Sequence, residues 1–343
     1  MPVAVGFVGT GGRAAEEMRD LLDMEDARIA AFCDIAPGRC ADALATCNRL
    51  QEQAGRPSLD VPFFSDVRDM LSTVALDAVY VSVPTFAHGA IEHAVLDAGR
   101  HLFVEKPIAI DMTVAREIAD HARRAGVVTC VGYQLRYAST SARAREALAG
   151  RAVGMATALR FGGLPEAPWW RVQRQSGGML IEQHTHAVDL LRFLMGDVTR
   201  VYAEADRRLL TDVPGLDISD VHAATLRFAS GAVGALGNSP ALIDGLSLPG
   251  VLSHIHVIAK GLTLSLAAGS RLTLVHPGGR REEVEAERGY NRALNDAFIH
   301  AVRTGDRSRI LSPYDDALRS FEVTYACVRS AERQEVVEIG AGY

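Results

Sequence analysis

The sequence predicts an α/β protein in which a doubly wound parallel sheet precedes an α+β domain with a large, mostly antiparallel open sheet. Up to about residue 132, apolar runs typical of strands buried on both faces alternate with helix-like segments, which indicates a parallel sheet wrapped by helices. Beyond that point strand-like runs are joined by short turns, such as 229–231 and 260–261, and helices flank them. This second pattern favours an antiparallel sheet.

Each half has a definite set of expected elements. In the first half we expect strands at 3–8, 27–33, 78–84, 101–104 and 127–131, and helices at 14–22, 39–54, 67–73, 88–98 and 113–124. In the second half we expect strands at 155–161, 200–206, 222–228, 233–238, 254–259, 262–266 and 272–275, helices at 179–194, 291–304 and 314–332, and loops near the site at 215–220 and 242–250. Residues 1–132 are therefore assigned to a dinucleotide-binding domain and 133–343 to a substrate-binding and oligomerisation domain.

Composition excludes several classes of protein. A chain of 343 residues suits two domains, and its net charge of -6 argues against a nucleic-acid partner. No apolar run reaches the ~18 residues of a membrane span, and the first residues lack a basic signal segment. The five cysteines are odd in number and lack metal-ligand spacing, so we expect no metal, reduced thiols and a cytoplasmic location.

The glycine turn that ends the first strand has the spacing of a dinucleotide fingerprint. Gly9 permits a tight turn, Gly11 permits close approach of a pyrophosphate, and Ala14 lets the new helix pack on the strand, as in a Rossmann domain. The helix N-terminus favours the negative phosphates. Asp34 ends the next strand, where an acid binds the adenosine ribose and disfavours a 2′-phosphate, so NAD is expected over NADP. The alternative for Asp34 is a helix cap or a turn.

Two further strands bring polar groups to the same edge of the sheet. Pro84 ends one of them, and the other leads into Glu105, Lys106 and Pro107. A lysine at this edge can hydrogen-bond a substrate oxygen and stabilise negative charge on it. The alternative is an ordinary surface lysine. Pro107 is a candidate for a cis peptide bond that aims Lys106 inward.

A second constellation lies on the expected helix 179–194. Glu182, His186 and Asp189 share one helical face there, and a carboxylate beside a histidine raises its basicity, as needed to take a proton from a hydroxyl. One alternative is a plain salt-bridged helix face. Another is a metal cluster with His184 and the pair His254/His256, which would require a strand here.

Aromatic and basic residues near the start of the second domain are candidates for substrate contact. Trp169 and Trp170 offer flat apolar faces that suit a sugar, although core packing is equally natural. Arg136 could reach the substrate or form a structural salt bridge. Arg136, Arg160 and Arg171 are each able to bind a phosphate or a carboxylate.

Taken together, these motifs resemble the Gfo/Idh/MocA family of NAD(P)-dependent oxidoreductases over nearly the whole chain. The resemblance rests on the glycine turn with Asp34, on Ala98-Gly99-x-His101 leading to Glu105-Lys106-Pro107, and on Gly177-Gly178 followed by Glu182, His186 and Asp189. It implies Lys106 and His186 as the catalytic pair, with Glu182 beside His186. The expected cofactor contacts are Gly9, Thr10, Gly11, Gly12, Arg13, Asp34, Ile35, Val83, Pro84, His88, Glu105 and Lys106. The expected substrate contacts are Gln134, Arg136, Trp170, Arg171, Glu182 and His186.

The resemblance implies hydride transfer between nicotinamide and a secondary alcohol of a sugar, aminosugar or cyclitol, in a homodimer or homotetramer formed through the C-terminal sheet. The chain departs from the family where Glu182 often is Asp and His184 often is Gly, which leaves substrate identity open. One alternative is a redox-neutral sugar enzyme that recycles tightly bound NAD in epimerisation, elimination or glycoside cleavage. The other is a non-catalytic sugar or nucleotide sensor.

Overall fold

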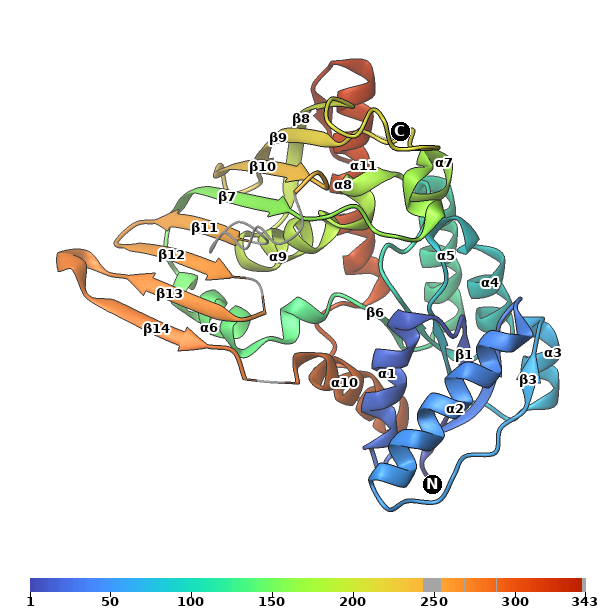
Figure 1. Ribbon diagram of the computed structural model, residues 1–343. Helices are drawn as coiled ribbons and strands as arrows, with labels where there is room; N and C mark the ends of the chain where they lie inside the picture. The colour runs from blue at the N-terminus through green and yellow to red at the C-terminus, as the bar shows by residue number, and fades with distance from the viewer. Residues whose placement is uncertain (243–253, 268, 288, 341–343) are drawn as a thin grey trace. The chain divides into compact units, whose positions relative to one another are not determined.

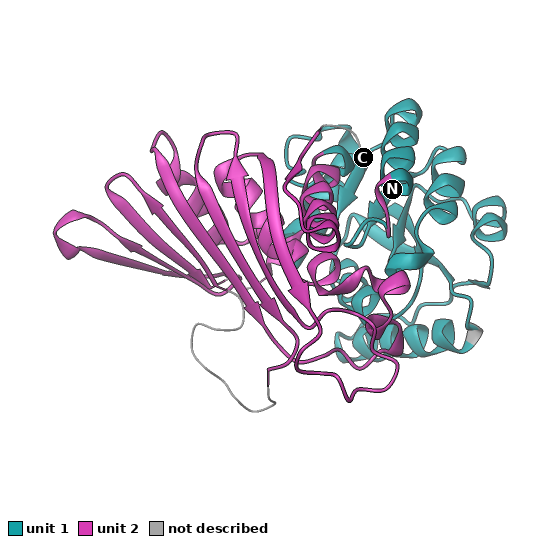
Figure 2. Cartoon of the chain, turned by 90° about the horizontal axis from the view of Figure 1, so that it is seen from above, with its two compact units in different colours: residues 1–109, 113–132, 291–315 teal, residues 110–112, 133–290, 316–343 magenta. Residues whose placement is uncertain are grey.

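The computed structural model describes residues 1–242, 254–267, 269–287 and 289–340 (Figure 1). The loop expected at 242–250 therefore lies almost entirely outside the described residues. The chain forms two compact units: residues 1–109, 113–132 and 291–315, and residues 110–112, 133–290 and 316–343 (Figure 2). In the part of the chain that is described, no helix is long and apolar enough to cross a membrane.

The first unit is built on a six-stranded parallel sheet with the order β3-β2-β1-β4-β5-β6, which is the Rossmann order. Its elements are β1 Val3–Val8, α1 Gly12–Leu22, β2 Ala27–Cys33, α2 Pro37–Gln53, β3 Phe63–Phe64, α3 Val67–Thr73, β4 Ala78–Val81, η1 Thr85–Ala87, α4 Ala90–Asp97, β5 His101–Val104, α5 Met112–Ala125 and β6 Thr129–Val131. The strand order reverses between β1 and β4, so ligands of such sheets bind beyond the carboxyl ends of these strands. The expected parallel sheet is confirmed, with a short β3 that the sequence did not indicate.

One helix far along the chain completes this unit. Helix α10 (Tyr290–Thr304) packs Phe298, which is fully buried, edge-on against Tyr80 and Phe103 at 5.5 and 5.7 Å between ring centroids. Residues 291–315 thus belong to the first compact unit, whereas the sequence-based division placed them in the second domain. Helical periodicity identified the helix, but periodicity does not say which sheet covers its apolar face.

The second unit is built on a nine-stranded sheet with the order β14-β13-β12-β11-β7-β10-β9-β8-β15, in which only β7 and β10 run parallel. Its elements are η2 Gln134–Tyr137, α6 Ser139–Leu148, β7 Val153–Phe161, η3 Pro168–Arg171, α7 Gln173–Ser176, α8 Gly178–Glu182, α9 Thr185–Met195, β8 Val198–Asp206, β9 Val221–Phe228, β10 Val233–Ser239, β11 His254–Ala259, β12 Leu262–Ala267, β13 Arg271–Val275, η4 Pro277–Gly279, β14 Arg281–Glu285, α11 Tyr314–Arg333 and β15 Val337–Glu338. The predicted large antiparallel sheet is confirmed.

The two faces of this sheet differ sharply. On one face, alternate residues such as Leu226 and Val257 are buried in a core to which α6, α9 and α11 contribute. The other face is open, and Ile258, Met155 and Val233 form a cross-strand row there with exposed fractions of 54%, 39% and 37%. An exposed apolar row of this kind suits contact with another protein surface.

Candidate active site

The turn after β1 contains two glycines of the fingerprint, and the fold itself requires glycine at only one of these two positions. Gly9 has φ +82°, and a Cβ there would lie 2.1 Å from the carbonyl oxygen of Ser82, so only glycine fits. Gly11 has an ordinary φ of −74°, and a Cβ there would come no closer than 3.8 Å to the nearest atom, a guanidinium nitrogen of Arg39. Among the described residues, neither the backbone conformation nor the neighbouring atoms exclude a side chain at position 11. A glycine there, at the start of α1, fits a role in letting a pyrophosphate approach the backbone closely.

Asp34 follows β2 at the same edge and is bonded to the turn itself. One carboxylate oxygen accepts hydrogen bonds from the amide and hydroxyl of Thr10, at 3.0 and 3.1 Å, and the other accepts one from the amide of Ala36 at 3.0 Å. The bond to Ala36 is the turn interaction that the sequence left as the alternative. The bonds to Thr10 fix the carboxylate beside the glycine turn. Ile35 next to it is 92% exposed.

Glu105, Lys106 and Pro107 follow β5, and the Lys106–Pro107 peptide is cis, as the sequence suggested. Glu105 is 3% exposed; its carboxylate pairs with the guanidinium of Arg13 at 2.9 Å and accepts a bond from the Lys106 amide at 3.2 Å. A Cβ on Gly132 would lie 2.6 Å from the Glu105 carboxylate. Glycine at the end of β6 therefore leaves the space that this buried acid occupies.

The structure adds polar residues, joined to Glu105 through Arg13, that sequence reasoning missed. Arg13 also pairs with Glu17 at 2.8 Å, and Glu17 accepts hydrogen bonds from Asn291 and Asn295 of α10. Burial, and then the charge of Glu105, raise the pKa of Glu17 to about 8. Spacing on α1 could have linked Arg13 with Glu17, but no local signal pointed to two asparagines almost 280 residues away.

His88 is fixed by a buried carboxylate. Its Nδ1 lies 2.5 Å from Glu92, whose other oxygen accepts a bond from the Gly89 amide at 2.7 Å. Burial alone would raise the pKa of Glu92, but the charge of His88 and these hydrogen bonds outweigh burial and lower it. Among the described residues the Nε2 of His88 is buried and has no hydrogen-bond partner, so it is the ring nitrogen whose bonding capacity is unused.

The expected single helix over 179–194 is wrong. Helix α8 ends at Glu182 and α9 begins at Thr185, because the amides of Gln183 and His184 both donate to the carbonyl of Met179, and Gln183 has φ −113°. Glu182 and His186 thus lie on two short helices rather than one continuous face. Since neither lies on a strand, the strand needed for the alternative metal cluster is absent from this segment.

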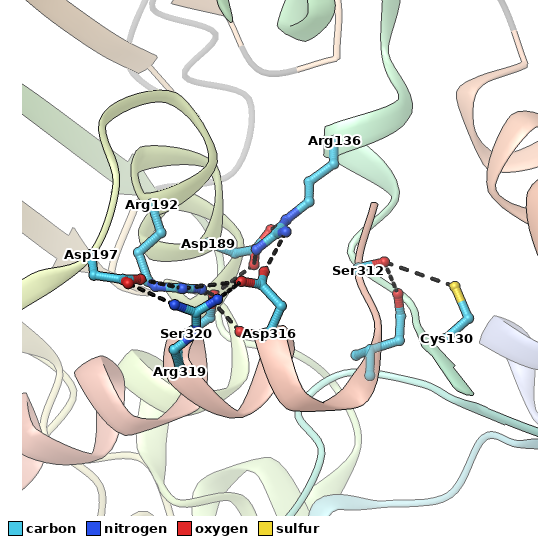
Figure 3. A network of polar contacts seen from close by, with 10 residues as sticks. Cys130, Arg136, Asp189, Arg192, Asp197, Ser312, Asp316, Arg319 and Ser320 are labelled. Atoms are coloured by element: carbon cyan, nitrogen blue, oxygen red, sulfur yellow. Dashed lines mark hydrogen bonds and ion pairs between the residues drawn. The ribbon is translucent and has the colours of Figure 1, made fainter. Parts of the chain in front are cut away.

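The third acid of the constellation belongs to another group of charges (Figure 3). Asp189 accepts both a 2.8 Å bond from Nε of Arg136 and a second guanidinium bond, and Ser320 donates to it at 2.7 Å. Arg136 is 4% exposed and also pairs with Asp316 at 2.5 Å, to which Arg192 is joined at 3.2 Å. The structure thus places Arg136 in the structural salt bridge that the sequence left as its alternative.

A pocket of about 220 Å³ in the second unit contains His186. Its described lining residues are Gln134, Leu135, Leu159, Arg160, Gln183, His186, Ala187, Leu190, His254 and Ile255. The ring of His186 is set edge-on to Tyr133, whose hydroxyl lies 2.7 Å from that of Thr185. Of the expected substrate contacts, the pocket brings together Gln134 and His186. The pocket also contains Gln183, which sequence reasoning missed, and Arg160, which the sequence offers only as a candidate for binding an anion.

The two tryptophans lie outside the described lining of this pocket. Trp169 and Trp170 pack on each other at 5.1 Å, and Trp170 packs against the buried cluster of Met179, Leu216 and Ile218. The carbonyl of Arg171 accepts a bond from the Asp217 amide at 2.9 Å. In the described structure this segment therefore makes the packing contacts that the sequence left as the alternative to sugar contact.

His184, one of the two residues at which the chain departs from the resembled family, is fully buried. Burial, and then the charges of His222 and Arg160, lower the pKa of His184 to about 3, so its ring stays neutral at physiological pH. Within the described ranges, no group of three or more His, Cys, Asp or Glu side chains is arranged to hold a metal ion.

Comparison with known proteins agrees with this geometry. Residues 3–133 match the model of the oxidoreductase family with an NAD-binding Rossmann fold, and residues 141–245 match the GFO/IDH/MocA C-terminal domain. The chain is 24% identical over 243 residues to myo-inositol 2-dehydrogenase of Thermotoga maritima, covering 70% of each protein. It is 26% identical over 360 residues to inositol 2-dehydrogenase 1 of Saccharopolyspora erythraea, covering 99% of this chain and 97% of that one. An oxidoreductase from Agrobacterium radiobacter, solved with NAD+, L-tartaric acid and magnesium, shares the fold with a TM-score of 0.82 at 20% identity, covering 99% of both chains.

Proposed function

The chain belongs to the Gfo/Idh/MocA family of NAD-binding oxidoreductases, and from this premise we propose that it oxidises a secondary alcohol of a sugar, aminosugar or cyclitol. The names of its relatives support this substrate class, since they include two inositol 2-dehydrogenases. The observation that carries the proposal is the position of His186, which lines a pocket large enough for a small ring, on a helix that begins one residue earlier.

In the proposed reaction, His186 takes the proton of the substrate hydroxyl as general base. Lys106 orients the same oxygen and stabilises the negative charge that develops on it. Glu182, the last residue of α8, is the acid proposed to tune His186. When bound, the nicotinamide supplies the hydride acceptor.

The cofactor is NAD, and we propose that its pyrophosphate contacts the backbone of Gly11 and Gly12. The absence of a side chain at position 11 and the backbone amides at the start of α1 support this contact. The Asp34 carboxylate, held by Thr10, would bind the ribose hydroxyls and repel a 2′-phosphate. Calorimetry should show tighter binding of NAD than of NADP, and equal affinities would contradict the role of Asp34.

We also propose that the chain forms a homodimer or homotetramer through the open face of its nine-stranded sheet. The exposed row of Ile258, Met155 and Val233 supports this surface. Light scattering of the purified protein measures the assembly, and a monomer would contradict it. The five free, buried cysteines support a cytoplasmic location, which localisation of the tagged protein in cells tests.

The reaction is tested by following NADH absorbance while a panel of inositols, aldoses, aminosugars and glycosides is added with free NAD. We expect NADH to accumulate steadily with at least one of them. His186→Ala should lower kcat/KM by about 10²–10⁴-fold. His276→Ala, a histidine of the same unit outside the pocket lining, should leave it unchanged. Product without NADH would favour the redox-neutral alternative, and ligand binding without any product would favour the sensor.

A further inference from the structure

The pocket that contains His186 is lined by hydrogen-bond donors rather than by acids. Its described polar lining consists of Arg160, His186, His254, Gln134 and Gln183, and no carboxylate is among them. Arginine has only donors, histidine and glutamine can donate or accept, and only Asp and Glu are purely acceptors when ionised. A wall of this composition favours a ligand rich in acceptor oxygens over one that presents only hydroxyl donors.

Arg160 supplies the fixed positive charge of this wall. It lies one residue before the end of β7, and its guanidinium donates to the side-chain oxygen of Gln183 at the break between α8 and α9. Burial lowers the pKa of Arg160, as expected for a desolvated guanidinium, although arginine stays charged at any physiological pH. Burial also lowers the pKa of His254, so this neighbour adds no permanent charge.

The three arginines that the sequence offered for anion binding have different surroundings. The charge of Arg136 is matched by Asp189 and Asp316 in a buried ion network. Arg171 lies in the tryptophan segment, outside the described lining of the pocket. Of the three, Arg160 is the one found among the described lining residues of the pocket, together with His186.

We propose that the substrate is a sugar acid whose carboxylate is bound by Arg160, with Gln183 as the residue that positions the guanidinium. This inference rests on the proposed function, since it names the substrate class of the same site. A single guanidinium matches one negative charge and can bind a carboxylate through two parallel hydrogen bonds. A phosphate carries nearly two charges at neutral pH and would be matched less well by one arginine. The volume of about 220 Å³ suits one small ring.

The test compares matched acids and neutral sugars. D-Glucuronate, D-galacturonate and D-gluconate are set against D-glucose, D-galactose and D-glucitol, with D-glucose 6-phosphate as the phosphate arm. Dissociation constants come from calorimetry and kcat/KM from NADH formation at saturating NAD. The variants are Arg160→Met, which removes the charge, and Arg160→Lys, which keeps it without the planar fork. Arg151→Met is the control, because Arg151 precedes the other end of β7 and its guanidinium donates to the backbone carbonyls of Ala147 and Lys260.

We expect at least one sugar acid to bind more tightly than its neutral counterpart. Arg160→Met should weaken binding of that acid by about 10- to 150-fold and change neutral sugars less than threefold. The affinity of Arg160→Lys for that acid should lie between those of the parent and Arg160→Met, and the affinity of Arg151→Met should equal that of the parent. Equal losses for acids and neutral sugars, no preference for acids in the parent protein, or a preference for the phosphate would each overturn the inference. Arg160-dependent binding of an acid without any NADH would support the inference while refuting the proposed oxidation.

Discussion

Each unit contains a partly buried group of ion pairs, and the two groups differ in their balance of positive and negative charge. In the first unit one guanidinium, Arg13, faces three carboxylates, those of Glu16, Glu17 and Glu105. In the second unit, ion pairs among the described residues join three arginines with three aspartates: Arg136, Arg192 and Arg319 with Asp189, Asp197 and Asp316.

The difference in balance shows in the direction of the pKa shifts. Burial, and then the negative charge of Glu105, raise the pKa of Glu17, so one proton can remain on the first group near neutral pH. In the second group burial alone would raise the pKa of Asp316, but Arg136 and Arg192 outweigh it and lower it. The balanced group therefore keeps its carboxylates ionised and stabilises the fold, whereas the acid-rich group beside Glu105 can hold a proton near neutral pH.

The largest effect should come from removing one arginine of the balanced group. Arg136→Met leaves Asp189 buried with its charge unmatched, so we expect the free energy of unfolding to fall by about 3–5 kcal/mol in urea titrations. The control is Arg319→Met, since Arg319 has a side chain that is 53% exposed and its pairs should contribute at most about 1 kcal/mol. Equal losses for the two variants would show that Arg136 is no more structural than a surface arginine.

A smaller effect on stability should follow when the pH is raised and Glu17 of the acid-rich group loses its proton. The folded pKa of Glu17 is about 8, above the ordinary value of roughly 4.3 in an unfolded chain. The folded state therefore holds a proton that the unfolded chain has released, and stability falls as the pH rises through this window, by about 1–3 kcal/mol. Arg13, Glu105, Asp20 and Asn295 face this carboxyl.

Glu17→Gln should remove that dependence, so the variant should lose less stability than the parent between pH 5 and pH 9. Urea titrations at several pH values measure it, and hydrogen exchange of β1 and α1 locates the change in the first unit. Parallel pH profiles for the parent and the variant would contradict the raised pKa.

The smallest effect on stability should appear when the pH is lowered and Asp316 of the balanced group takes up a proton. The folded pKa of Asp316 is lowered, so its contribution is fully present above the unfolded value of roughly 3.9 and is lost as the pH falls through the folded pKa. We expect this contribution to be about 1 kcal/mol, because the side chain is 22% exposed. Asp316→Asn should be less stable than the parent at pH 7 but not at pH 2.5, and an equal deficit at both would contradict the assignment.

The sequence predicted most of the fold because its signals are local. Strands β1, β2, β5 and β11 and helix α3 have the bounds expected from apolar runs and turn residues. The strands 78–84 and 127–131 are shorter than expected, at Ala78–Val81 and Thr129–Val131. Helix α6 and strand β14 were not predicted. Strand β14 gives no apolar signal, because its sequence Arg281-Glu282-Glu283-Val284-Glu285 has one apolar residue.

The glycine turn, Asp34 and the cis bond before Pro107 could be predicted because each depends on a few neighbouring residues and on where a strand ends. The fate of each charged side chain could not, because it depends on partners distant in sequence. Asp189 is bound by Arg136, 53 residues away, and Arg13 by Glu105, 92 residues away. Tertiary packing alone decided which arginine lines the pocket with His186, because burial and charge matching arise only when separate strands and helices meet.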